Sequence, residues 1–123
     1  MNTQYHGVHR ILRAFVNSWN GLKSAFCTQA AFRQDLLLCA VATVALIFIP
    51  VGIGNKILMF FSLWLIIIAE LINTAIETVI DRIGPEYHEM SKCAKDIGSA
   101  IVLITITGVV LFWAAIVFMN TLF

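Results

Sequence analysis

Three long apolar runs constrain the fold more than any other feature of the chain. They cover residues 36–53, 57–80 and 97–119, and the first and third contain no charged side chain. A helix rises about 1.5 Å per residue, so about 20 residues cross the roughly 30 Å hydrocarbon core of a bilayer. With 60% hydrophobic residues and a mean hydropathy of +0.91, the composition lies outside the range of soluble domains. The runs therefore predict an all-α integral membrane protein with three transmembrane helices.

A further helix is predicted ahead of the first run. From Val8 to Phe26 apolar residues recur at every third or fourth position, with arginine, lysine and asparagine side chains between them. Cations on one side and tryptophan or phenylalanine on the other are typical of a helix that lies in the membrane interface. The alternative, packing on a soluble core, has little soluble mass to support it. We therefore expect an N-terminal amphipathic interfacial helix.

Charge and cysteine content exclude several classes of function. The formal net charge is +1, which indicates neither nucleic acid nor an acidic partner. The three cysteines, Cys27, Cys39 and Cys93, form no C-x-x-C pair, and their odd number argues against a disulfide framework. Because no long apolar run begins before Leu36, no cleaved secretory signal is expected. We expect one domain over residues 1–123, without an internal repeat.

The distribution of basic residues predicts the orientation. Four lie between Arg10 and Arg33 and three lie in the segment 81–96, whereas the opposite side of the membrane has only Lys56. Lysine and arginine accumulate in cytoplasmic segments. The N-terminus and the segment 81–96 should therefore face the cytoplasm.

The second apolar run ends in a row of carboxylates. On a helix Glu70, Glu77 and Asp81 fall within about 20° of one line, and Asn73 and Thr74 flank it. An ionisable side chain at the depth of Glu70 is costly and indicates a functional site by default. A structural carboxylate that pairs with a neighbouring helix is the alternative, and it suits a lone Glu70 better than a trio.

The residues around these carboxylates resemble a known family signature. The segments concerned are Glu70-x-x-Asn73-Thr74-Ala75-Ile76-Glu77-x-x-Ile80-Asp81-Arg82, Glu86-Tyr87-His88 and Ala94-Lys95-Asp96-x-Gly98-Ser99-Ala100. They are similar to the signature of the prokaryotic integral-membrane diacylglycerol kinases, a family that includes undecaprenol kinases. Shorter segments, Ser18–Leu22 and Ala30–Gln34, extend the resemblance over nearly the whole chain.

The resemblance implies a lipid kinase in the bacterial inner membrane, with its active site toward the cytoplasm. Such an enzyme transfers the γ-phosphoryl group of ATP to the hydroxyl of diacylglycerol and gives phosphatidate, a step of phospholipid recycling. It also implies a homotrimer with sites shared between chains. Undecaprenol is the alternative acceptor, and the sequence does not distinguish the two lipids.

The chemistry of the residues agrees with phosphoryl transfer, which needs charge neutralisation and alignment. Glu77 can hold Mg²⁺, Lys95 can contact the phosphates, and Glu70 can accept the proton of a lipid hydroxyl. No P-loop and no kinase glycine loop is present, so the nucleotide site must be built differently. A different class stays open, a small transporter that uses Glu70 as a proton or cation site.

The resemblance also implies a role for each matched position. Glu70 would be the catalytic base and would contact the lipid, and Glu77 and Gln29 would hold Mg²⁺. The residues that would contact ATP are Arg10, Asn17, Gln29, Asn73, Glu77, Asp81, Glu86, Tyr87, His88, Lys95 and Asp96. Those that would line the lipid are Arg33, Lys56, Glu70 and Ser99.

Gln29 departs from the family pattern. The family usually reads N-E-A-A-F-R-Q, whereas this chain reads Thr28-Gln29-Ala30-Ala31-Phe32-Arg33-Gln34, so an amide replaces a metal-binding carboxylate. An amide oxygen can bind Mg²⁺ but brings no charge. We therefore expect a raised Mg²⁺ requirement, unless Asp35, further along the same predicted helix, supplies the charge.

Overall fold

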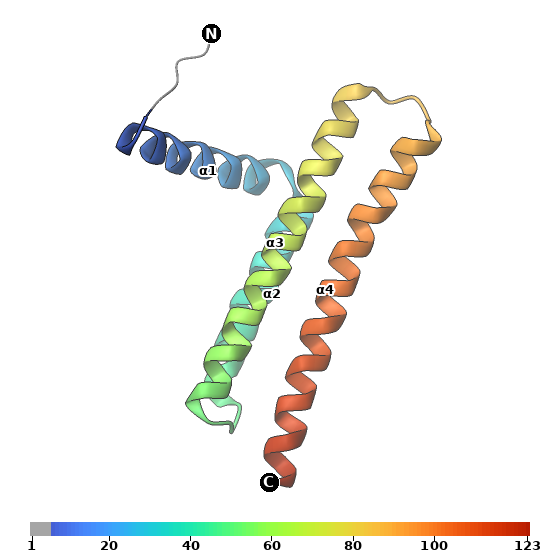
Figure 1. Ribbon diagram of the computed structural model, residues 1–123. Helices are drawn as coiled ribbons and strands as arrows, with labels where there is room; N and C mark the ends of the chain where they lie inside the picture. Colours follow the sequence, from blue (N-terminus) through green and yellow to red (C-terminus); the bar gives the residue numbers. More distant parts are fainter. Residues whose placement is uncertain (1–5) are drawn as a thin grey trace.

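Four α-helices make up the part of the chain that the structure, a computed structural model, describes, residues 6–123 (Figure 1). They are α1 (Val8–Thr28), α2 (Ala30–Phe48), α3 (Ile53–Ile83) and α4 (Glu89–Leu122). α2, α3 and α4 are each long and apolar enough to cross a membrane. The predicted all-α fold with three membrane-spanning helices is therefore confirmed at this level.

α3 is the element on which the others assemble. α2 and α4 both pack along it, and α1 projects sideways from the bundle (Figure 1). The small buried core joins Leu63 and Ile66 of α3 to Val109 of α4, with partly buried apolar side chains of α2 and α4 around them. Most large apolar side chains are exposed on a single chain, including Phe15 and Trp19 of α1 at 71% and 69%. Such exposure suits contact with lipid or with further chains.

Two hydrogen bonds fasten the end of α4 to the rest of the bundle. The indole Nε1 of Trp113 donates to Oγ of Ser62 at 2.9 Å, which links α4 to α3. The amide Nδ2 of Asn120 donates to the carbonyl of Pro50 at 2.8 Å, in the turn between α2 and α3. Both pairs lie at the end of the bundle away from the carboxylates.

The turn between α2 and α3 differs from the prediction. Pro50, Gly52, Gly54 and Asn55 favour a turn at these positions, but α2 ends at Phe48 and α3 begins at Ile53. Ile49 is extended (φ −74°, ψ 125°), because a proline disfavours helical geometry in the residue before it. α2 also begins at Ala30, before the uncharged run, so its first turns carry Arg33 and Asp35.

A short link that contains Gly84 and Pro85, residues that commonly interrupt helices, separates α3 and α4. Gly84 has φ 151°, a conformation that side-chain-bearing residues rarely adopt, and it ends α3. His88 caps the N-terminus of α4, because its Nδ1 accepts a hydrogen bond from the backbone N–H of Met90 at 3.1 Å. α4 then runs without a break from the polar segment into the apolar one.

Candidate active site

The carboxylate row predicted from the sequence lies on one continuous helix, α3. Glu70, Asn73, Glu77 and Asp81 are spaced by three and four residues, so they share a face. Two of them contact α4, since Asp81 pairs with Lys95 and Asn73 lies against Gly98. The contact between α3 and α4 thus joins two segments of the signature into one site.

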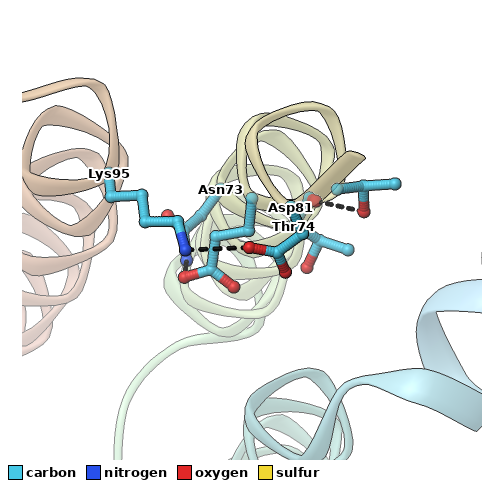
Figure 2. Close-up of polar contacts among 6 residues, drawn as sticks. Asn73, Thr74, Asp81 and Lys95 are labelled. Carbon is cyan, nitrogen blue, oxygen red and sulfur yellow. Dashed lines mark hydrogen bonds and ion pairs between the residues drawn. The ribbon is translucent and has the colours of Figure 1, made fainter. Parts of the chain in front are cut away.

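Lys95 reaches across from α4 to α3. Its Nζ lies 2.9 Å from a carboxylate oxygen of Asp81, and Figure 2 shows the side chain extending between the helices. The two side chains are 43% and 68% exposed, and an ion pair of this kind contributes at most about 1 kcal/mol to stability. Its consequence is geometric, because it holds a cation beside Glu77. Lys92 forms a separate pair with Asp96 at 2.6 Å on the outer side of α4.

Asn73 lies between two carboxylates of its own helix. Its Nδ2 donates to Oε1 of Glu77 at 3.4 Å, and the side chain also acts electrostatically on Glu70, one turn earlier. Its Oδ1 is buried and has no hydrogen-bond partner among the described residues. The amide therefore presents its Nδ2 to Glu77 and its oxygen to α4.

Glu70 is the most enclosed ionisable side chain of the site, with only 4% of its surface exposed. Asp35 of α2 lies close enough to act on it electrostatically, and so does Glu77. Sequence analysis considered Asp35 as a source of charge for a metal and missed its contact with Glu70. That contact joins side chains from two helices, and the only signal for it is an acidic residue at the edge of an apolar run.

The segment Glu86-Tyr87-His88 lies in the link between α3 and α4, at the same end of the bundle as Asp81 and Lys95. All three side chains are exposed, and Tyr87 is 79% exposed. Ser99 is exposed on α4, one turn after Lys95. These residues are available to a ligand that approaches the α3–α4 pair at the end where the link joins the two helices.

Five predicted site residues lie apart from this group, and one of them, Gln29, is described below. Arg10 and Asn17 are exposed on the first part of α1, which points away from α3 (Figure 1). Arg33 donates from Nη1 to the carbonyls of Phe26 and Cys27 at 2.6 and 3.3 Å, so it caps the end of α1. Lys56 donates to the carbonyl of Ile47 at 3.2 Å, and it lies about 21 Å before Glu70 along α3.

With this geometry established, comparison with known proteins identifies the family. The chain matches the prokaryotic diacylglycerol kinase family over residues 16–117. The chain belongs to that family. It is 45% identical to a diacylglycerol kinase of Escherichia coli K12 over 107 residues, which cover 87% of this chain and 88% of that protein. Diacylglycerol kinases of Haemophilus influenzae and Pseudomonas aeruginosa are 40% and 41% identical, over 91% and 89% of this chain and 95% and 89% of theirs. The resemblance read from the signature is thereby confirmed.

The kinases of this family imply a divalent metal, and the described residues fit one that arrives with its nucleotide. Within residues 6–123 of a single chain, no three His, Cys, Asp or Glu side chains converge on a possible metal position. Glu77 offers one carboxylate, while the nearby Asn73 presents a donor to it. Mg²⁺ is commonly bound by one or two carboxylates together with substrate phosphates, which suits this donor set.

The sequence predicted that Gln29 and Asp35 share a helix, but they do not. Gln29 is the single residue between α1 and α2, extended at φ −115° and ψ 110°, and it is half-buried. Asp35 instead belongs to α2 and contacts Glu70. The two positions therefore face different surroundings.

Sequence analysis also missed a cleft between α1 and α3. It has a volume of about 660 Å³ and is lined by small and hydroxyl side chains, among them Ser18, Ser24 and Thr28 of α1 and Thr74 and Thr78 of α3. Oγ of Thr74 is buried and has no hydrogen-bond partner among the described residues. The cleft gives the polar half of α3 a second accessible side, opposite the carboxylates' contact with α4.

Proposed function

We propose that this protein transfers the γ-phosphoryl group of ATP to the hydroxyl of diacylglycerol and produces phosphatidate. The observation that carries the proposal is the grouping of an enclosed Glu70 with the Asn73–Glu77 and Asp81–Lys95 pairs where α3 meets α4. Family membership supports the same activity, since the curated relatives are diacylglycerol kinases. This is the activity that the signature predicted.

In the proposed reaction Glu70 acts as the general base. It accepts the proton of the lipid hydroxyl while the hydroxyl oxygen forms a bond to the γ-phosphorus. The bond from that phosphorus to the bridging oxygen breaks, and the electron pair leaves with ADP. The enclosed position of Glu70, 4% exposed, keeps water from competing with the lipid for the phosphoryl group.

The neighbouring side chains align the nucleotide. Lys95 contacts the phosphates, and its present partner Asp81 holds it in place until they arrive. Glu77 and Gln29 would hold Mg²⁺, which would neutralise phosphate charge when bound. Asn73 holds the metal ligand Glu77 through the hydrogen bond from its Nδ2, one turn from the base Glu70. The nucleotide is also contacted at the linked end of the α3–α4 pair, by Glu86, Tyr87, His88 and Asp96.

The site is completed by a second copy of the chain. Arg10 and Asn17, which the family resemblance assigns to ATP, are exposed on the first part of α1, which projects away from α3 of its own chain (Figure 1). The exposed apolar side chains of all four helices supply the contact surface for an oligomer. We propose a homotrimer in which α1 of one chain contributes to the nucleotide site of the next.

The lipid approaches from within the membrane, along surfaces that include Arg33, Ser99 and Lys56. Ser99 lies on α4 one turn from Lys95, where it can contact the polar part of the lipid. Lys56 lies near the α2–α3 turn, so it contacts the distal part of the acyl chains rather than the reacting hydroxyl.

We further propose that the N-terminus and the α3–α4 link face the cytoplasm of a bacterial inner membrane, where ATP is available. Cys93 is exposed near this link. In a Cys27→Ser/Cys39→Ser variant, an impermeant thiol reagent should label Cys93 only after the membrane is opened. A cysteine introduced by Asn55→Cys in the further variant that also carries Cys93→Ser should be labelled from outside. Reversed labelling would contradict the orientation.

The activity is tested with purified protein in mixed micelles that contain labelled ATP and either diacylglycerol or undecaprenol. We expect label to enter the diacylglycerol fraction. Preferential labelling of undecaprenol would assign the alternative acceptor. If neither lipid is labelled while the protein in liposomes moves protons or cations, the transporter hypothesis replaces the kinase.

A further inference from the structure

Gly98 of α4 lies directly against the side chain of Asn73. Gly98 is buried, and a methyl group built on it would overlap Oδ1 of Asn73. The same methyl group would lie 3.4 Å from Cγ of Asn73 and 3.5 Å from Cδ1 of Ile76. The glycine therefore provides a hollow of about one methyl group, which the Asn73 oxygen fills. Figure 2 shows Asn73 on the side of α3 that faces Lys95, which lies on α4 as Gly98 does.

The hollow fixes which way the Asn73 amide points. Its Nδ2 donates to Glu77, whereas Oδ1 has no hydrogen-bond partner among the described residues. Turning the amide over would place its oxygen against carboxylate oxygens, which are acceptors only when ionised. The oxygen is therefore accommodated only on the side of Gly98.

We propose that Gly98 is a positioning residue for phosphoryl transfer. Because it lacks a side chain, it leaves room for Oδ1 of Asn73, and this fixed position of the oxygen directs the amide Nδ2 toward the metal ligand Glu77. The inference deepens the proposed function, on which it rests, because Gly98 itself touches neither substrate nor metal. It also gives a reason for a glycine in the interior of a helix, where glycine is otherwise unfavourable.

The structure predicts how a substitution would act. The atom that a Cβ at Gly98 would meet is the end of a side chain, so Asn73 can turn aside without separation of the helices. Gly98→Ala should then leave the fold intact but detach the amide from Glu77. A misplacement of about 1 Å in a catalytic site can lower turnover by about 10²-fold.

The matched control is Gly108→Ala. Gly108 is an interior glycine of the same helix, and a Cβ there would meet nothing within 4 Å. In mixed micelles with diacylglycerol we expect kcat to fall by about 10²-fold in Gly98→Ala and by less than about twofold in Gly108→Ala. The thermal unfolding midpoints of both variants should stay close to that of the parent chain. Equal losses of activity, or unchanged activity in Gly98→Ala, would overturn the proposal.

A double-variant cycle with Asn73→Ala separates positioning from a general packing effect. Its second readout is the Kd of a non-hydrolysable ATP analogue with Mg²⁺, measured without lipid. If Gly98 acts through Asn73, adding Gly98→Ala to Asn73→Ala should change neither kcat nor this Kd further. Additive losses would contradict the proposal. It would also be contradicted if Gly98→Ala unfolds, while the double variant folds and shows the same additional loss of kcat. Absence of lipid phosphorylation by the parent chain would instead refute the proposed function, while the Kd cycle still decides the role of Gly98.

Discussion

The two ends of the α3–α4 pair use polar side chains in opposite ways. At the end near the α2–α3 turn, Trp113 donates to Ser62 and Asn120 donates to a backbone carbonyl, so neutral donors meet acceptors between elements. At the other end Oδ1 of Asn73 is buried without a partner among the described residues, and the charges of Asp81 and Lys95 are partly exposed. The polar groups named at the first end are paired within the chain, whereas the second end keeps a buried acceptor without a partner among the described residues.

This difference indicates what each end is for. A buried polar atom without a partner costs about 1–3 kcal/mol, so it persists only where the surroundings compensate for it or where function requires it. Hydrogen bonds that are complete within the chain hold helices together. Groups left charged, accessible or unpaired remain available to a ligand, and in this chain they are the residues of the kinase signature. Substitutions at the two ends should therefore affect different measured quantities.

The largest effect is expected at Glu70. Glu70→Gln preserves the size of the side chain but removes the basic oxygen, so kcat should fall by about 10²-fold or more. Nucleotide affinity and the thermal unfolding midpoint should change little. The measurement is kcat with diacylglycerol in mixed micelles beside the Kd for ATP. Unchanged turnover would exclude Glu70 as the base.

Lys95 should come next, with Lys92 as its matched control. Both lysines lie on α4 and both pair with an aspartate, at 2.9 and 2.6 Å. Only Lys95 points across to α3, so Lys95→Ala should lower kcat/KM for ATP by about 10- to 100-fold, the worth of a hydrogen bond to a charged group. Lys92→Ala should change it by less than about threefold. Equal effects of the two substitutions would contradict a specific phosphate contact. Intact ion transport by Lys95→Ala, without any kinase activity in the parent chain, would favour the transporter.

The extent to which the sequence predicted this arrangement depends on the range of the interaction. The membrane helices follow from apolar runs, and the carboxylate face follows from spacing along one helix, both of which are local properties. The family signature was sufficient to identify the kinase family, and the family match confirms it. The end of α2 at Phe48 also follows from local sequence, because Pro50 disfavours helical geometry in the residue before it. The uncharged run 36–53 otherwise gave no sign of this end.

Contacts between helices were not predictable in the same way. The approach of Asp35 to Glu70 and of Gly98 to Asn73 depends on how α2 and α4 pack against α3, and no spacing rule within one helix contains that information. The resemblance assigned Arg33 and His88 to ligands. In the structure Arg33 caps the C-terminal end of α1, and His88 caps the N-terminus of α4. A capping role does not exclude a ligand role for either residue, and both assignments remain predictions.

A smaller effect, on stability rather than activity, is expected at the opposite end of the bundle. Ser62→Ala leaves the indole N–H of Trp113 without its acceptor. Hydrogen bonds between membrane helices contribute about 0.6 kcal/mol on average and about 1.7 kcal/mol at most, so the free energy of unfolding should fall by this amount. Thr121→Ala is the control, because its hydroxyl bonds only a carbonyl of its own helix and is exposed. Unfolding in detergent micelles measures the difference, and kcat of both variants should be retained. Loss of turnover with unchanged stability in Ser62→Ala would remove the contrast between the two ends.

The smallest expected effect on activity concerns Gln29, where the chain departs from its family. Gln29 lies between α1 and α2 rather than on the α3–α4 pair, and its amide oxygen can bind Mg²⁺ without neutralising it. Gln29→Glu adds a charge, so the half-saturating Mg²⁺ at fixed ATP should fall by a few fold, about 1 kcal/mol. Asp35→Asn is the companion variant. Because Asp35 contacts Glu70 rather than Gln29, it should lower kcat without changing the Mg²⁺ dependence. If Gln29→Glu leaves the Mg²⁺ dependence unaltered while Asp35→Asn weakens it, the compensating charge comes from α2, and the metal role of position 29 is wrong for this chain.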